Sequence, residues 1–263
     1  MDLRFDSSLA LSYRSQSQRI RVMSEAWMAE NMYCPVCGHL RLSHLSNNKP
    51  VEDFLCEHCR ESFELKSFLL RNPMEPRWQK KLNDGECSTA IERIKSNTNP
   101  SLFVLAYSPD YEVSDLVLIP RFFFVPDIIE ERKPLKETAR RAGWTGCNIL
   151  IGNVPRQGKI DIIRNRNPVS RKKVVMAYDH LAQLNLAKRT IETRGWLLDV
   201  LTCVNEIQKP EFDLDDVYRF EERLSQKHPG NNNIRPKIRQ QLQFLRDKGF
   251  IEFLSPGRYR KIS

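Results

Sequence analysis

Hydrophobic positions in the first two thirds of the chain mostly follow the short periods of β-strands. Segments that alternate polar and apolar residues predict strands with one buried face, and continuous apolar runs predict strands buried on both faces. By these criteria we expect strands over residues 49–55, 61–67, 101–107, 115–119 and 158–163. Helical spacing predicts helices over residues 19–32, 90–95 and 171–189. Strands and helices mixed in this order indicate an α/β core.

From Gly195 onward the hydrophobic residues change to the helical period of three to four positions. The pattern predicts three helices, with apolar faces at Trp196, Leu197, Val200, Leu201, Val204 and Ile207, then at Leu214, Val217, Phe220 and Leu224, then at Ile234, Ile238, Leu242 and Leu245. Asp213 is placed to cap the second helix, and Gly249 to end the third. Residues 250–254 and 258–262 then predict a β-hairpin. Three helices followed by a hairpin indicate a winged helix-turn-helix domain.

The change of period divides the 263 residues into two predicted domains. We expect an α/β domain over residues 1–190 and a winged-helix domain over residues 191–263, with a linker around 190–194. No stretch approaches the ~18 apolar residues that span a membrane. The N-terminal residues also lack the apolar segment of a secretory signal. We expect a cytoplasmic protein that has no membrane partner and acts as a monomer.

Charge changes this picture because the basic excess is concentrated in two segments. The whole chain carries a net charge of +9. Residues 132–173 contain twelve basic and two acidic side chains, and residues 231–263 contain eight basic and two acidic ones. The remainder is therefore net acidic, and the two basic segments suit contact with a polyanion such as nucleic acid. From charge alone, two solvated faces are an equal alternative.

Four of the seven cysteines form two Cys-x2-Cys pairs that are separated by eighteen residues, namely Cys34, Cys37, Cys56 and Cys59. This spacing is typical of a closed four-thiolate zinc site, which stabilises a small fold and leaves no coordination position open. Gly38 follows the first pair and allows the positive φ with which backbone amides approach a sulfur. His39, His44 and His58 are alternative ligands nearby. Disulfides are the other interpretation, which an oxidising compartment would favour.

The second cysteine pair lies between two predicted strands, so the zinc knuckle would form the turn of a hairpin. On the second strand Glu64 and Lys66 share one face, and Asp53 on the first strand can lie beside them. The order Asp53-x10-Glu64-x-Lys66, with Pro50 ahead of it, is similar to the motif of the PD-(D/E)xK nucleases. Two carboxylates and the carbonyl of Leu65 would form a hard oxygen site for Mg²⁺, and the lysine can activate a water or stabilise charge on a phosphate. A solvated strand face is the alternative.

Two further groups of residues are candidate DNA contacts. In the major groove arginine reads guanine, and glutamine or asparagine reads adenine. The third C-terminal helix and the residues before it offer Asn232, Asn233, Arg235, Arg239, Gln240 and Gln243. In the first domain Arg140, Arg141 and Trp144 belong to a basic, aromatic loop. The alternatives are a structural tryptophan and a winged helix that contacts proteins.

Several strings along the chain resemble those of the DpnI-type restriction endonucleases. They are the Cys-Pro-x-Cys-Gly knuckle at 34–38 and residues 63–67, 83–85, 139–144, 194–196, 238–243 and 245–248. The resemblance extends over most of the chain, in the order zinc ribbon with embedded nuclease motif, α/β core and winged helix.

This resemblance implies a methyl-directed type II restriction endonuclease that depends on Mg²⁺. The family cuts double-stranded DNA at GATC when the adenines are N6-methylated, and it leaves blunt ends. The resemblance implies that Asp53 and Glu64 bind Mg²⁺ and that Lys66 is the catalytic lysine. It also implies that Trp144 lies against the methylated adenines and that both domains read the methylated site.

The chain departs from the family pattern between Lys66 and Asn83. This stretch is longer and more basic, and it contains Pro73 and Pro76. Because it follows the catalytic lysine, contacts with flanking bases could differ. One alternative is therefore a nuclease with relaxed methyl dependence. The alternative from another class is a zinc-ribbon winged-helix regulator that binds DNA without cutting it.

Overall fold

The computed structural model describes residues 1–45, 52–72 and 81–262. Pro50 and residues 73–80 of the long stretch after Lys66, including Pro73 and Pro76, lie outside the described residues. By its internal contacts the chain divides into two compact units.

The first unit comprises residues 1–153 and 157–182, and the second comprises residues 154–156 and 183–263. The domain boundary predicted after residue 190 lies a few residues beyond the division at residue 183, and it stays a prediction.

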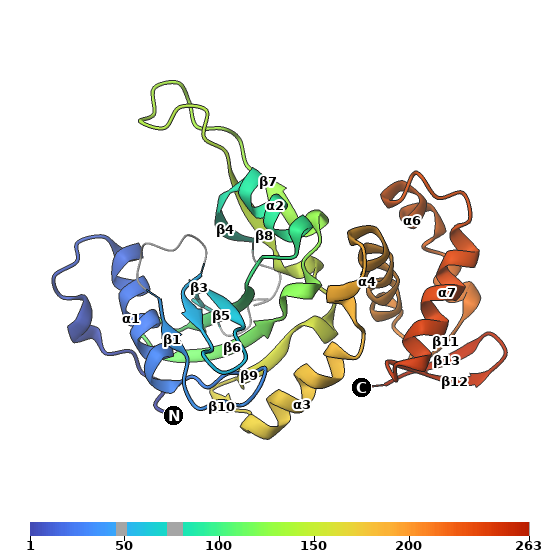
Figure 1. Cartoon of the computed structure of the whole chain (residues 1–263), viewed down its shortest axis with the longest axis horizontal. Coiled ribbons are helices and arrows are strands. Elements are labelled where there is room, and N and C mark those ends of the chain that lie inside the picture. The colour runs from blue at the N-terminus through green and yellow to red at the C-terminus, as the bar shows by residue number, and fades with distance from the viewer. Residues whose placement is uncertain (46–51, 73–80, 263) are drawn as a thin grey trace. The chain divides into compact units, whose positions relative to one another are not determined.

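A seven-stranded sheet with the order β1-β2-β3-β5-β6-β9-β10 forms the centre of the first unit (Figure 1). Its strands are β1 (Ser43–His44), β2 (Phe54–Leu55), β3 (Ser62–Leu69), β5 (Ser101–Tyr107), β6 (Val113–Ile119), β9 (Ile160–Arg164) and β10 (Asn167–Pro168). Strands β3 and β5 are parallel, and the other neighbours are antiparallel. Every residue of β5 and β6 is buried, which confirms the two apolar runs as buried central strands.

A second sheet, with the order β4-β8-β7, belongs to the same unit. Its strands are β4 (Lys81–Glu86), β7 (Ile129–Glu131) and β8 (Gly146–Leu150), and the helix α2 (Cys87–Ser96) packs against all three. Residues 132–145 connect β7 to β8 as a long loop that projects from this sheet (Figure 1). The hydrophobic pattern did not predict this sheet, because β4 and β7 are mostly polar and Leu82 is the one buried residue in the two strands.

Two helices cover the large sheet. The helix α1 (Gln16–Asn31) packs against β1 and β3, and α3 (Arg171–Ala182) packs against β9. Short 3₁₀ helices lie at Ser7–Ala10, Arg121–Phe123, Pro126–Ile128, Ile151–Asn153, Arg156–Gly158 and Leu186–Lys188. The helix predicted over 171–189 is therefore too long, since it ends at Ala182 and a separate short turn follows. In the described part of the chain, no helix is both long and apolar enough to cross a bilayer.

The second unit contains four α-helices and a small sheet among its described residues. Its elements are α4 (Ile191–Glu206), β11 (Glu211–Asp213), α5 (Leu214–Tyr218), α6 (Glu221–Lys227), α7 (Ile234–Asp247), β12 (Ile251–Ser255) and β13 (Arg258–Lys261), and the sheet has the order β11-β13-β12. Asp213 caps α5 in a reciprocal capping box with Asp216, as the sequence predicts. Gly249 follows α7 with φ +72°, and the four apolar residues of the α7 stripe are all buried.

Two expectations about this unit are wrong. The expected linker at 190–194 is the start of α4, because the Thr190 side chain accepts a hydrogen bond from the Thr193 amide and caps a helix there. The expected second helix is two helices, α5 and α6, which break at Arg219 and Phe220. The Arg223 guanidinium lies 4.6 Å from the centre of the Phe220 ring, a contact that the apolar period does not reveal.

Candidate active site

The four predicted zinc ligands come together at one point of the first unit. The sulfurs of Cys34, Cys37, Cys56 and Cys59 all lie within 4.8 Å of one another. The Cys34–Cys59 and Cys37–Cys56 sulfur pairs are 3.6 and 3.7 Å apart. Four sulfurs at ~2.3 Å from a tetrahedral zinc would lie about 3.8 Å from each other, so the cluster fits the ion. Gly38 has the expected positive φ of 75°.

The groups around the four cysteines favour the cysteines, and not the nearby histidines, as the metal ligands. The amides of Val36 and Cys37 point to the sulfur of Cys34. His39 and His58, two of the alternative ligands, instead stack on each other with ring centres 5.6 Å apart. Among the residues that the structure describes, the four-cysteine cluster is the one group of three or more potential ligands close enough for an ion. The cysteines are free of disulfides.

The second cysteine pair, Cys56 and Cys59, lies in the turn of the predicted hairpin. Strands β2 and β3 pair antiparallel, with Phe54 opposite Phe63. Both phenylalanines are fully buried, and Phe63 stacks on Phe103 of the neighbouring strand. This packing fixes the strand and leaves Glu64 on its other face.

The hairpin brings the three predicted catalytic side chains together. The Asp53 carboxylate accepts a hydrogen bond of 2.7 Å from the backbone amide of Leu65. On the same strand the Lys66 ammonium lies 2.6 Å from the carboxylate of Glu64. The Asp53 carboxylate therefore lies against the backbone of β3 at the residue between its two predicted partners.

A further carboxylate, that of Asp84, completes the cluster and was not predicted. Its Oδ1 accepts a hydrogen bond of 2.8 Å from the Lys66 ammonium. Asp84 belongs to β4 in the second sheet, so the ammonium lies between carboxylates from two sheets. The resemblance of residues 83–85 to the family was the one signal in the sequence that singled out this position.

The cluster is sheltered from water, and this shifts its pKa values. Burial, with the nearby charges of Asp84 and Asp53, outweighs attraction to Lys66 and raises the pKa of Glu64 to about 7. Burial alone would lower the pKa of Lys66, but attraction to Glu64 and Asp84 outweighs it and raises this pKa above its usual value. Carboxylates crowded in this way are suited to a cation, because each added positive charge relieves their repulsion.

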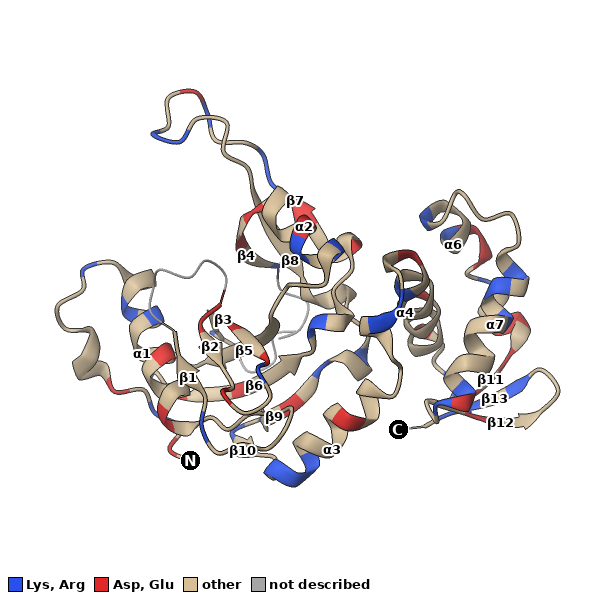
Figure 2. Cartoon of the chain, in the orientation of Figure 1, with Lys and Arg blue, Asp and Glu red and all other residues tan. Residues whose placement is uncertain are grey.

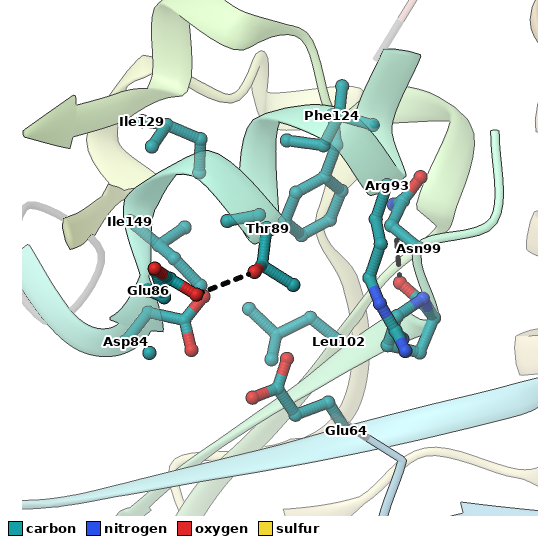
Figure 3. A pocket seen from close by; sticks show the side chains of 14 residues that line it. Glu64, Asp84, Glu86, Thr89, Arg93, Asn99, Leu102, Phe124, Ile129 and Ile149 are labelled. Atoms are coloured by element: carbon teal, nitrogen blue, oxygen red, sulfur yellow. Dashed lines mark hydrogen bonds between the residues drawn. The ribbon is translucent and has the colours of Figure 1, made fainter. Parts of the chain in front are cut away.

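A pocket opens beside the cluster, between the two sheets of the first unit (Figure 3). Glu64 and Asp84 line it together with apolar side chains of α2 and both sheets, including Ile94, Leu102 and Ile149. In Figure 3 both carboxylates point into this space. The Glu86 side chain instead accepts a hydrogen bond from the Thr89 hydroxyl at the pocket wall.

The predicted loop residues lie in the second half of the β7–β8 connection. Arg140 and Arg141 are exposed, and the Arg141 guanidinium lies 4.9 Å from the centre of the half-buried Trp144 ring. A Cβ at Gly146 would lie 2.8 Å from that ring, so the indole rests directly on the backbone at the start of β8. Basic residues occur along this loop and again along α7 (Figure 2).

All six candidate contacts at α7 are exposed: Asn232, Asn233, Arg235, Arg239, Gln240 and Gln243. Three of them have side-chain partners within the unit, since the Gln240 side-chain oxygen accepts a hydrogen bond of 3.3 Å from the Gln241 side chain. The Arg235 guanidinium pairs with Glu221 at 2.8 Å, and the Arg239 guanidinium donates to the Tyr218 hydroxyl at 3.1 Å. The remaining polar face of the helix is open to a ligand.

These observations define a class of protein. A mixed α/β unit holds a cluster of four cysteines with the geometry of a zinc site, and a helical unit with an exposed basic helix and a small sheet follows it. Comparison with known families agrees with this description. Residues 1–187 match the model of the DpnI, Dam-replacing family, and residues 192–261 match that of the Dam-replacing HTH domain. The chain belongs to the DpnI Dam-replacing family and carries its C-terminal helix-turn-helix domain, a DNA-binding fold.

Proposed function

We propose that this protein is a Mg²⁺-dependent restriction endonuclease that cuts double-stranded DNA at GATC sites with N6-methylated adenines and leaves blunt ends. The observation that carries the proposal is the sheltered cluster of Asp53, Glu64 and Lys66 on a hairpin held by the four-cysteine cluster. Membership of the DpnI family supports the substrate, and the helix-turn-helix domain supports DNA as the ligand.

In this proposal the carboxylates of Asp53 and Glu64 and the carbonyl of Leu65 hold Mg²⁺. When bound, the ion supplies Lewis-acid polarisation of the scissile phosphate and acidifies a water. Lys66 is placed to orient the attacking water or to stabilise charge on the phosphate, because its ammonium lies 2.6 Å from Glu64. The buried phenylalanines behind β3 restrict the movement of these groups.

The two units have separate roles in reading the site. Trp144, with Arg140 and Arg141 beside it, is proposed to contact the methylated adenines and the backbone near them. The exposed face of α7 is proposed to read the same sequence through the major groove, with Arg239, Gln240 and Gln243 as its central contacts. Two independent readings of one site would raise the discrimination against unmethylated DNA.

The test is to incubate the zinc-loaded protein and Mg²⁺ with two plasmids that differ only in adenine methylation at GATC. We expect the methylated plasmid to be cut to blunt-ended fragments and the unmethylated one to stay intact. Cutting of both plasmids would point to relaxed methyl dependence. Binding without cutting of either would support the regulator and contradict the proposal.

A further inference from the structure

Asp84 lies beside the catalytic lysine although it comes from a different sheet. Lys66 belongs to β3 in the large sheet, and Asp84 belongs to β4 in the small one. Their side chains meet at 2.8 Å and are both sheltered, with 22% and 12% of the side-chain surface exposed. An ion pair so little exposed is held far more firmly than a surface pair.

The backbone of β4 is shaped to direct this carboxylate. Strand β4 pairs with β8, and the register shifts between Asp84 and Glu86 in the manner of a β-bulge. Bulges redirect side chains and often lie next to active sites. Opposite Asp84 lies the buried Cys147, whose sulfur is 4.0 Å from the second carboxylate oxygen and limits its movement.

Lys66 needs this second partner for an electrostatic reason. When Glu64 binds a divalent cation, its negative charge is shared with that ion and attracts the ammonium less. The carboxylate of Asp84 then supplies the attraction that keeps the ammonium in the site.

We propose that Asp84 is the positioning residue for Lys66, and that it holds the ammonium in place from the second sheet while Glu64 binds the metal. The proposal rests on the proposed nuclease function. Asp84 acts through Lys66 and is not itself a metal ligand. The contact between Asp84 and Lys66 connects the lysine to the small sheet, and the β7–β8 loop of that sheet contains Trp144.

The first test is single-turnover cleavage of a methylated GATC duplex by Asp84→Asn, which keeps the size of the side chain and removes its charge. We expect the cleavage rate to fall by about 10²-fold, the effect of misplacing a catalytic group by ~1 Å. Duplex affinity measured in Ca²⁺ should stay unchanged. Asp84→Glu keeps the charge and should recover part of the cleavage rate. If Asp84→Asn does not fold, Asp84→Glu takes its place in the test.

The matched control is Glu130→Gln in the same small sheet. Glu130 also pairs with a lysine, Lys81 of β4, at 2.6 Å, but it does not contact Lys66. This variant should cleave at the wild-type rate. Wild-type cleavage by Asp84→Asn would overturn the proposal.

A second readout needs no cleavage and therefore separates this proposal from the proposed function. In protein with ¹⁵N-labelled lysine and no Mg²⁺, the sheltered Lys66 ammonium should give a slowly exchanging NMR signal, assigned by its absence in Lys66→Arg. Asp84→Asn should lose or shift this signal, and Glu130→Gln should keep it. An unchanged signal in Asp84→Asn would overturn the proposal even if the wild-type protein cleaves no DNA.

Titration with Mn²⁺ distinguishes a positioning residue from a metal ligand. We expect Asp84→Asn to bind Mn²⁺ as tightly as the wild-type protein does, because its carboxylate acts on the lysine. Weaker Mn²⁺ binding together with an intact Lys66 signal would make Asp84 a ligand and contradict the proposal.

Discussion

At the scale of single residues, the candidate site combines groups that would destabilise the fold if they were charged and alone. Glu64 is sheltered beside Asp84 and Asp53, and the lysine between them offsets only part of their repulsion. Active sites commonly hold such groups at the expense of stability. The site of this protein should therefore show its electrostatics in unfolding experiments as well as in catalysis.

The raised pKa of Glu64 predicts how stability depends on pH. The pKa of Glu64 is about 7 in the folded protein and 4.5 in the unfolded chain. The stability of the fold with protonated Glu64 is therefore fully present below pH 4.5 and is lost as the pH rises through 7, because the buried carboxylate then ionises. Glu64→Gln cannot ionise, so without Mg²⁺ we expect it to exceed the wild-type stability at pH 8 by up to ~3 kcal/mol. At pH 4.5 the two proteins should converge. Urea unfolding of the zinc-loaded proteins measures this, and equal stability at pH 8 would contradict the assignment.

Sequence reasoning found three residues of the site because they are close together on one hairpin. The alternation along β3 places Glu64 and Lys66 on one face, and the zinc knuckle brings Asp53 alongside. Asp84 could not be found in this way, because its contact with Lys66 depends on how two sheets pack. No spacing rule within one strand contains that information.

At the scale of elements, the hydrophobic period predicted the buried strands and the apolar faces of the C-terminal helices. It did not predict β11, which has three residues and is held to β13 by contacts between residues far apart in the chain, such as the stacking of Phe212 on Tyr259. It also merged α5 and α6, because neither glycine nor proline stands at Arg219 and Phe220 where they separate. Short strands and unmarked breaks depend on tertiary contacts rather than on local preference.

The start of β8 offers a test of how the tryptophan loop is supported. A Cβ at Gly146 would lie 2.8 Å from the Trp144 ring, whereas a Cβ at the neighbouring Gly85 has nothing within 4 Å. We therefore expect Gly146→Ala to displace the indole and to reduce the preference for methylated over unmethylated duplexes, as Trp144→Ala should. Gly85→Ala is the matched control and should keep the preference. Cleavage rates on the two duplexes provide the measurement, and full preference in Gly146→Ala would reject this role for the loop.

At the scale of the whole molecule, the basic excess is divided between two units with different folds. One basic segment includes the projecting β7–β8 loop, and the other includes α7 and the hairpin of β12 and β13. The acidic remainder includes the carboxylates of the candidate metal site. This distribution suits a protein that holds one polyanion with two surfaces and binds a cation between strands of the first unit.

Dependence of binding on salt tests whether both units contact the same duplex. Each phosphate contact contributes about one to the slope of log affinity against log salt concentration. We expect the double substitution of Arg140 and Arg141 by alanine to reduce this slope by about 2, and Arg239→Ala to weaken binding independently. Lys95→Ala, an exposed lysine outside both basic segments, is the control. If either substitution leaves affinity and slope unchanged, the unit that carries it does not bind the duplex.

The proposed cleavage depends on the carboxylates of the hairpin at the cysteine cluster, and Asp53→Asn removes the charge of one of them. The asparagine can still accept the hydrogen bond from the Leu65 amide, so the hairpin should keep its shape while the metal site loses a charge. The measurement is binding and single-turnover cleavage of the same methylated GATC duplex by zinc-loaded protein. We predict wild-type affinity in Ca²⁺ and no cleavage in Mg²⁺, whereas cleavage at the wild-type rate would contradict the account.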